Sequence, residues 1–171
     1  MIFAGDPSAT RVVDDRSRVF QVGSRTDYSR VEMYNVGTST RLTYQFDFCI
    51  IRASMGPAVG LAAYGRIEGS GGNDLHFNGQ GFINFCDNWG AGVRVGQWEA
   101  NTWHTYKVEI DFEAGTANVY IDGALVKENV KAARICNTNP PRPFDAFSIN
   151  GGHSNTGQGN LFLIDNIVLS R

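Results

Sequence analysis

The chain lacks any apolar segment that could cross a bilayer, because no run approaches the roughly 20 residues that a spanning helix needs. Strong charge of one sign is also missing: the net charge is −2 over 171 residues, which argues against nucleic acid or a membrane surface as a partner. The first residues, Met-Ile-Phe-Ala-Gly-Asp, have neither the basic start nor the apolar centre of a signal peptide. We therefore expect no membrane insertion, and a mature protein or a module of a larger protein.

Cysteine is scarce and odd in number. Cys49, Cys86 and Cys136 are too far apart in sequence for the paired spacing of a zinc site. We interpret them as small apolar side chains in or near the sheets, with one disulfide and one free thiol as the alternative. The sequence also has no serine-nucleophile elbow, phosphate loop or dinucleotide fingerprint, so it offers no motif for the enzymes that depend on them.

Glycine is frequent and proline is scattered, as expected for many strands joined by many turns. The apolar fraction of 42% is ordinary and sufficient for a hydrophobic core. At this length one domain is expected, and we assign residues 1–171 to it.

The clearest local pattern is the stretch from Trp103 to Gly123. Apolar and polar residues alternate with a period of two, then a short loop containing Gly115 follows, and a second alternating run ends at Asp122-Gly123. Alternation of this kind predicts strands with one buried face, and the loop joins them into a β-hairpin.

The same period recurs along the chain and predicts an all-β, two-sheet antiparallel sandwich. We expect residues 2–10 to be irregular, 37–40 to be a turn and 126–136 to lean towards helix. The predicted strands are 11–13, 18–22, 30–35, 42–51, 58–68, 74–78, 82–86, 92–96, 144–150 and 161–169. The predicted core consists of Phe46, Phe48, Leu61, Phe77, Phe85, Val108, Ile110, Val119, Ile121 and Ile149.

The Trp-His-Thr-Tyr strand and its Val-Tyr-Ile-Asp-Gly partner resemble a hairpin of the concanavalin A-like lectin and glucanase superfamily, which includes laminin-G-like domains. The resemblance implies a two-sheet jelly roll that handles oligo- or polysaccharide outside the cell or at its surface. Within this superfamily, Glu109-Ile-Asp-Phe-Glu113 is similar to the catalytic signature of laminarinases and lichenases, where the two glutamates act as nucleophile and general acid.

Two arguments count against catalysis by these two glutamates. A retaining glycosidase needs carboxylates about 5–5.5 Å apart, whereas positions i and i+4 of a strand lie roughly 13 Å apart. In addition, the family's signature occupies an earlier strand than the Trp-His-Thr-Tyr strand. We therefore predict no catalytic residues, and a solvated strand face for Glu109, Asp111 and Glu113 together with Lys107.

If the sheet curves as in the family that the chain resembles, a ligand-binding face is predicted on its concave side, where three successive strands turn polar and aromatic side chains away from the core. Aromatic rings stack on the C–H faces of sugars, and planar polar groups bond their hydroxyls. A mixed polar sheet face without a ligand is the alternative. The predicted binding residues are Tyr64, Arg66, His76, Asn78, Phe82 and Asn84, with Trp89 from a neighbouring loop.

The closing strand Ile164-Asp-Asn-Ile-Val168 also resembles the family, in which such an aspartate often binds a structural calcium ion. The resemblance implies Ca²⁺ at Asp165, with oxygens near Gly5 and Asp6 as further ligands. A carboxylate that accepts bonds from backbone N–H groups is the alternative.

We expect, then, a lectin-like module that binds carbohydrate without cleaving it. The first alternative is a glycoside hydrolase or polysaccharide lyase on the same scaffold, which converging carboxylates would favour. The second is a structural or adhesive domain with a protein partner, which an exposed apolar surface would favour.

Overall fold

The computed structural model describes residues 2–4, 20–22, 29–52, 59–62, 73–77, 81–87, 92–132, 144–151 and 161–170. This part of the chain contains no helix, and so none that could span a membrane. Its strands are β1 (Ile2–Ala4), β2 (Phe20–Val22), β3 (Ser29–Ser39), β4 (Arg41–Arg52), β5 (Val59–Ala62), β6 (Asn73–Phe77), β7 (Phe82–Asp87), β8 (Val93–Gln97), β9 (Trp103–Asp111), β10 (Thr116–Ile121), β11 (Ala124–Lys131), β12 (Phe144–Gly151) and β13 (Leu161–Ser170).

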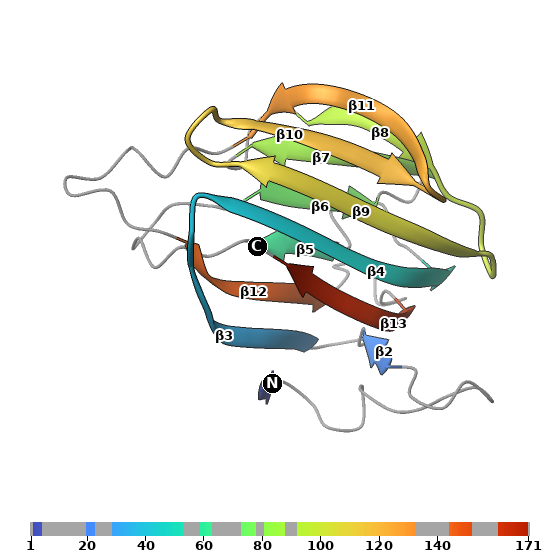
Figure 1. The fold of residues 1–171 in the computed structure, drawn as a ribbon. Coiled ribbons are helices and arrows are strands. Elements are labelled where there is room, and N and C mark those ends of the chain that lie inside the picture. The colour runs from blue at the N-terminus through green and yellow to red at the C-terminus, as the bar shows by residue number, and fades with distance from the viewer. Residues whose placement is uncertain are drawn as a thin grey trace.

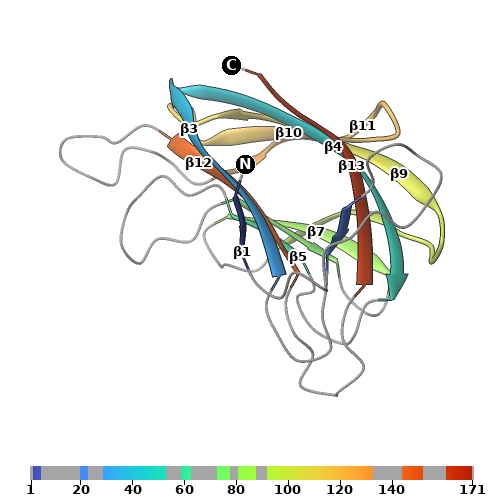
Figure 2. The same cartoon turned by 90° about the horizontal axis from the view of Figure 1, so that it is seen from below.

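The strands form two antiparallel layers, which confirms the predicted all-β sandwich. One layer is a six-stranded sheet in the order β11-β10-β9-β4-β13-β2. The other contains β1-β3-β12-β5 and β6-β7-β8, and β5 lies beside β6 so that the two groups continue one another. Figure 1 shows the six-stranded layer in front of the other layer, and Figure 2 shows the two layers from below. Each layer has one outer face, and each outer face carries a candidate site.

The hairpin at the centre of the sequence forms as predicted. In β9 and β10, Val119 pairs with Val108 and Tyr120 with Lys107, and Gly115 adopts φ 69° in the turn between the two strands. A two-residue loop then leads into β11, because Asp122 and Gly123 both take positive φ, 51° and 79°. Two positive φ values in a two-residue loop are the requirement of a type I′ turn, for which Asp-Gly is a favoured pair.

The core lies between the layers and is dominated by the alternating residues of the six-stranded sheet and of β7. Of the predicted core residues whose side chains are described, all but one are buried, and Ile121 is half-buried and packs against the rest. Leu61, Phe77 and Ile149 lie in strands, but their side chains are outside the described part. The confirmed core residues are Phe46, Phe48, Phe85, Val108, Ile110 and Val119.

Three predictions of local structure are wrong. Residues 124–131 form strand β11 instead of leaning towards helix, because the type I′ turn returns the chain antiparallel onto β10. Ile2–Ala4 is a strand that pairs with β3, where we expected irregular chain. The turn expected at 37–40 is shorter, since β3 continues through Ser39 and pairs there with Phe144 of β12.

Candidate functional site

The structure describes only part of the predicted binding face. Phe82 and Asn84 lie on β7, half-buried and on the opposite side from the buried Ile83 and Phe85. In the backbone register, His76 of β6 is the direct partner of Asn84, so those two positions are neighbours. The remaining predicted binding residues lie outside the described residues: Tyr64, Arg66, Asn78 and Trp89.

Phe82 has a partner that the sequence did not reveal. The guanidinium carbon of Arg94, on the neighbouring strand β8, lies 3.2 Å from the centre of the Phe82 ring. A guanidinium stacked on a ring gains cation–π attraction and keeps its N–H donors in the plane of the group. The outer surface of β7 and β8 therefore combines an aromatic ring, a cation and the amide of Asn84; we call these three residues the β7 surface.

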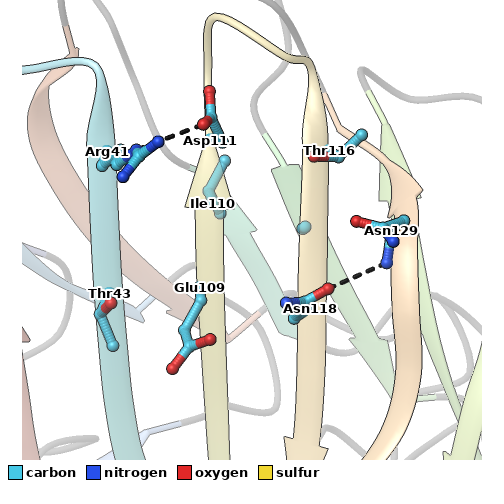
Figure 3. Close-up of a pocket in the computed structure, with 9 residues that line it drawn as sticks. Arg41, Thr43, Glu109, Ile110, Asp111, Thr116, Asn118 and Asn129 are labelled. Carbon is cyan, nitrogen blue, oxygen red and sulfur yellow. Dashed lines mark hydrogen bonds and ion pairs between the residues drawn. The ribbon is translucent and has the colours of Figure 1, made fainter.

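A concave feature lies on the outer face of the six-stranded sheet (Figure 3), and we call it the outer groove. Its volume is about 400 Å³, and it opens widely to solvent. Two cross-strand rows form it: Arg41 pairs with Asp111 and Asp111 with Thr116, while Thr43 pairs with Glu109 and Glu109 with Asn118. The groove is lined by Arg41, Thr43, Glu109, Ile110, Asp111, Thr116, Ala117, Asn118 and Asn129.

Glu109 is held by two neighbours on this face. Lys107 Nζ lies 2.6 Å from Oε1 of Glu109, and the Tyr120 hydroxyl donates to Oε2 at 2.9 Å. The hydrogen bond from Lys107, followed by that from Tyr120, lowers the pKa of Glu109 below its ordinary value. The hydrogen bond to Glu109 likewise raises the pKa of Lys107 and that of Tyr120. Glu109 is therefore an ionised acceptor at neutral pH.

The carboxylate of Asp111 also has two partners, one for each oxygen. Its Oδ1 accepts from the backbone N–H of Ala114 at 2.8 Å, which is the main reason that its pKa is lowered. Its Oδ2 lies 3.2 Å from Nε of Arg41. The first bond fixes the turn after β9, and the second joins the ends of β9 and β4.

The geometry of the carboxylates does not suit acid catalysis by Glu109. A glycosidase general acid needs a raised pKa so that it holds a proton near neutral pH, whereas the pKa of Glu109 is lowered. Glu113 is exposed in the turn after β9 ends at Asp111, so it does not share a strand with Glu109.

A polar network continues along the same outer face beyond the groove. Asp47 accepts from the Thr105 hydroxyl at 2.6 Å and from the side-chain amide of Asn166 at 2.7 Å, which links β4, β9 and β13. On the core-facing side of β9, His104 packs against Phe48, and its Nδ1 lies 2.8 Å from Oδ2 of Asp122 in the type I′ turn. Burial would raise the pKa of Asp122, but its hydrogen bonds with His104 and the Thr105 backbone lower it overall.

Of the two predicted calcium-binding carboxylates, the structure describes only Asp165. Oδ1 of Asp165 accepts from the backbone N–H of Asn166 at 2.8 Å, so one carboxylate oxygen already has a backbone donor. The residues that the structure describes hold no group of three or more His, Cys, Asp or Glu side chains suited to a metal. Asp6, the second predicted ligand, lies outside them. The described donors thus amount to a single carboxylate, and they do not by themselves make a calcium site.

Sequence reasoning missed the outer groove as a site. The alternation in each strand correctly placed Thr43, Glu109 and Asp111 away from the core, but alternation cannot tell which positions of separate strands stand side by side. Only the register brings the short Thr43 next to the long Glu109 and so leaves a hollow.

Comparison with known proteins identifies the fold and no family. No protein-family model matches the chain, and no curated protein does. Among solved structures, a Trypanosoma rangeli sialidase in complex with 2,3-difluoro-KDN is similar with a TM-score of 0.66 at 15% identity, over 94% of this chain. The cellulose-induced protein Cip1 is similar with a TM-score of 0.64 at 12% identity, over 93% of this chain.

A third similar structure is that of botulinum neurotoxin type C, a toxin whose cell entry is described as dependent on interaction with two ganglioside molecules. Its TM-score is 0.61 at 15% identity, over 98% of this chain. The chain spans 26% of the sialidase, 42% of the toxin chain and 82% of Cip1. At such identities the likeness establishes a shared β-sandwich fold.

Proposed function

We propose that this domain is a concanavalin A-like, laminin-G-like jelly roll that binds carbohydrate through the β7 surface and does not cleave it. The observation that carries the proposal is the stacked pair of Phe82 and Arg94 beside Asn84, on the side of β7 away from the core. Two of the similar structures, the sialidase complex with a sugar analogue and the ganglioside-dependent toxin, are consistent with this ligand class.

The chemistry of the β7 surface suits a sugar. The Arg94 guanidinium covers one face of the Phe82 ring, so the stacked pair offers a planar surface to a pyranose, while Asn84 and the edge of the guanidinium offer donors to its hydroxyls. Because Arg94 already rests on Phe82, both groups are held in place before a ligand arrives, and less side-chain entropy is lost on binding. The predicted His76, Tyr64, Arg66, Asn78 and Trp89 would extend this surface.

Binding without cleavage is supported by the state of the carboxylates. Glu109 and Asp111, the two acidic residues of the motif on β9, have lowered pKa values and are held by neighbours. Neither can hold a proton for a leaving group at neutral pH. We also propose an extracellular or cell-surface setting, further domains in the complete protein, and a structural Ca²⁺ at Asp165.

A glycan array with product analysis of every hit tests the proposal. We expect selective retention of one class of oligo- or polysaccharide, with the recovered glycan unchanged in length after prolonged incubation. Shortened or unsaturated products would instead identify a hydrolase or a lyase. Failure to retain any glycan across the array would refute the carbohydrate proposal and favour a protein partner.

A further inference from the structure

We propose that the outer groove is a second saccharide site, which takes a short neutral oligosaccharide and works independently of the β7 surface. The two sites lie on the outer faces of different layers of the sandwich, so neither needs the other. The argument rests on the shape, the charge balance and the hydrogen-bonding capacity of the groove.

The shape follows from side-chain length. Thr43, Thr116 and Asn118 are short and stand beside Arg41 and Glu109, which are long, so the register leaves a depression between the two rows (Figure 3). Its volume of about 400 Å³ lies within the range of roughly 300–1,000 Å³ that is common for small-molecule sites. The wide opening favours a ligand that lies along the surface, such as a short glycan chain.

The charge balance favours a neutral ligand. Arg41 is paired with Asp111, and Glu109 with Lys107, so each charge of the groove already has a counter-charge. An ionic ligand would have to compete with these pairs and be desolvated at the same time. A neutral ligand leaves the pairs intact.

Hydrogen-bonding capacity remains on the uncharged residues. In the part of the chain that the structure describes, the hydroxyls of Thr43 and Thr116 and the side-chain amide of Asn129 have no hydrogen-bond partner. Asn118 Oδ1 accepts from the Asn129 backbone N–H at 2.9 Å, which fixes the bend of β11 beside the groove (Figure 3). A row of hydroxyls and amides can both donate to and accept from sugar hydroxyls.

The affinity should be modest and nearly independent of salt. Each hydrogen bond to a sugar replaces one to water at little net gain. Tyr120, the neighbouring aromatic residue, does not line the groove, and the Lys107 ammonium lies 4.6 Å from the centre of its ring. Screening weakens interactions between charges, so a neutral ligand should lose little affinity when the salt concentration rises.

The test is a titration of the ¹⁵N-labelled protein with β-1,4-linked tetrasaccharides of glucose, mannose, galactose and xylose, followed by amide chemical shifts. We expect at least one tetrasaccharide to cause saturable shifts centred on Thr43, Glu109 and Asn118. Thr43→Tyr, which fills the groove, should abolish them. Thr102→Tyr, which places the same ring at an exposed position before β9, should leave them unchanged.

A second variant covers the case in which Thr43→Tyr does not fold. Thr116→Val keeps the shape and removes one hydroxyl, and it should weaken binding by about two- to ten-fold, the worth of one hydrogen bond. The groove site is refuted if no tetrasaccharide causes saturable shifts there, or if binding survives Thr43→Tyr or Thr116→Val unchanged. Phe82→Ala should leave the groove shifts unchanged. If no glycan shifts the amides of the β7 surface in the wild type while the groove binds, that result would count against the proposed function and not against this second site.

Discussion

The two outer faces of the sandwich differ in how they satisfy their polar groups. On the β7 surface a cation rests on an aromatic ring, and the pair is open to the solvent side. In the outer groove the cations rest on carboxylates, and only short uncharged side chains remain available. The first face can therefore bind through stacking and the second through hydrogen bonds alone. The same fold thus offers two surfaces with different chemistry, and substitutions should separate them.

The largest expected effect distinguishes the two sides of β7. Phe85 is 1% exposed, so Phe85→Ala should destabilise the domain by about 3–5 kcal/mol. Phe82 is half-buried on the other side, and Phe82→Ala should cost about 1 kcal/mol or less, chiefly the cation–π contact. Urea denaturation of both variants measures the difference. Equal losses would show that Phe82 is part of the core and that the β7 surface is not a binding face.

The next effect concerns the close approach of Gly96 and Ile121, which lie in different layers of the sandwich. A Cβ at Gly96 of β8 would collide with Cδ1 of Ile121 of β10, so Gly96→Ala should cost about 1–3 kcal/mol. Adding Ile121→Val, which removes that carbon, should recover part of the loss. Thermal unfolding of the two single variants and the double variant measures the coupling. Strictly additive losses would show that the two side chains do not meet.

Calcium should act on the six-stranded sheet and not on the β7 surface. With a dissociation constant of about 10⁻⁴–10⁻³ M, 1 mM Ca²⁺ added after chelation should stabilise the domain by about 0.4–1.4 kcal/mol. Asp165→Asn keeps an oxygen for the Asn166 N–H and should remove the effect. The measurement is the melting temperature with and without calcium. An unchanged melting temperature for the wild-type protein would eliminate the calcium site.

The smallest effect is a dependence of stability on pH that belongs to the outer-groove side. The pKa values of Glu109, Asp111 and Asp122 are lowered in the folded state, so their contribution is complete above their ordinary values of 4.5 and 3.8. Their contribution to the free energy of unfolding should be lost as the pH falls below about 4.5. For the solvent-accessible Lys107–Glu109 pair, we expect this loss to be roughly 1 kcal/mol or less. Melting temperatures between pH 3 and pH 7 measure the loss.

Glu109→Gln should flatten this acid profile, and Phe82→Ala should leave it as in the wild type. An identical slope in Glu109→Gln would mean that the pair with Lys107 contributes nothing to folding.

How far the sequence predicts this molecule depends on whether the information is local. The period of two in β4 and β9 reports burial directly, so the core and the outward positions of Phe82 and Asn84 could be predicted. Strand β11 was missed because its exposed run, interrupted by Asn129 at φ 52°, has no alternation. It becomes a strand through pairing with β10, which is a tertiary effect.

The two candidate sites also divide into features that a single strand reveals and features that depend on how strands pair. Phe82 could be proposed from one strand, but its contact with Arg94 requires the alignment of β7 with β8, which carries a bulge between Ile83 and Asn84. The outer groove depends on four strands in register. No pattern within a single segment specifies it, since Arg41 and Asp111 are 70 residues apart in the sequence.

The most direct test of the central claim is calorimetric titration of the wild type, Phe82→Ala and Val168→Ala with the best glycan from the array. Val168 is an exposed apolar residue of the other layer, 53% accessible, and serves as the matched truncation. If the β7 surface binds carbohydrate through stacking, Phe82→Ala should weaken binding by about two- to ten-fold, which corresponds to one aromatic stacking contact of about 0.5–1.5 kcal/mol. Val168→Ala should bind as the wild type does. Equal affinity in all three proteins, with Phe82→Ala folded, would contradict the assignment of the β7 surface as the carbohydrate-binding face.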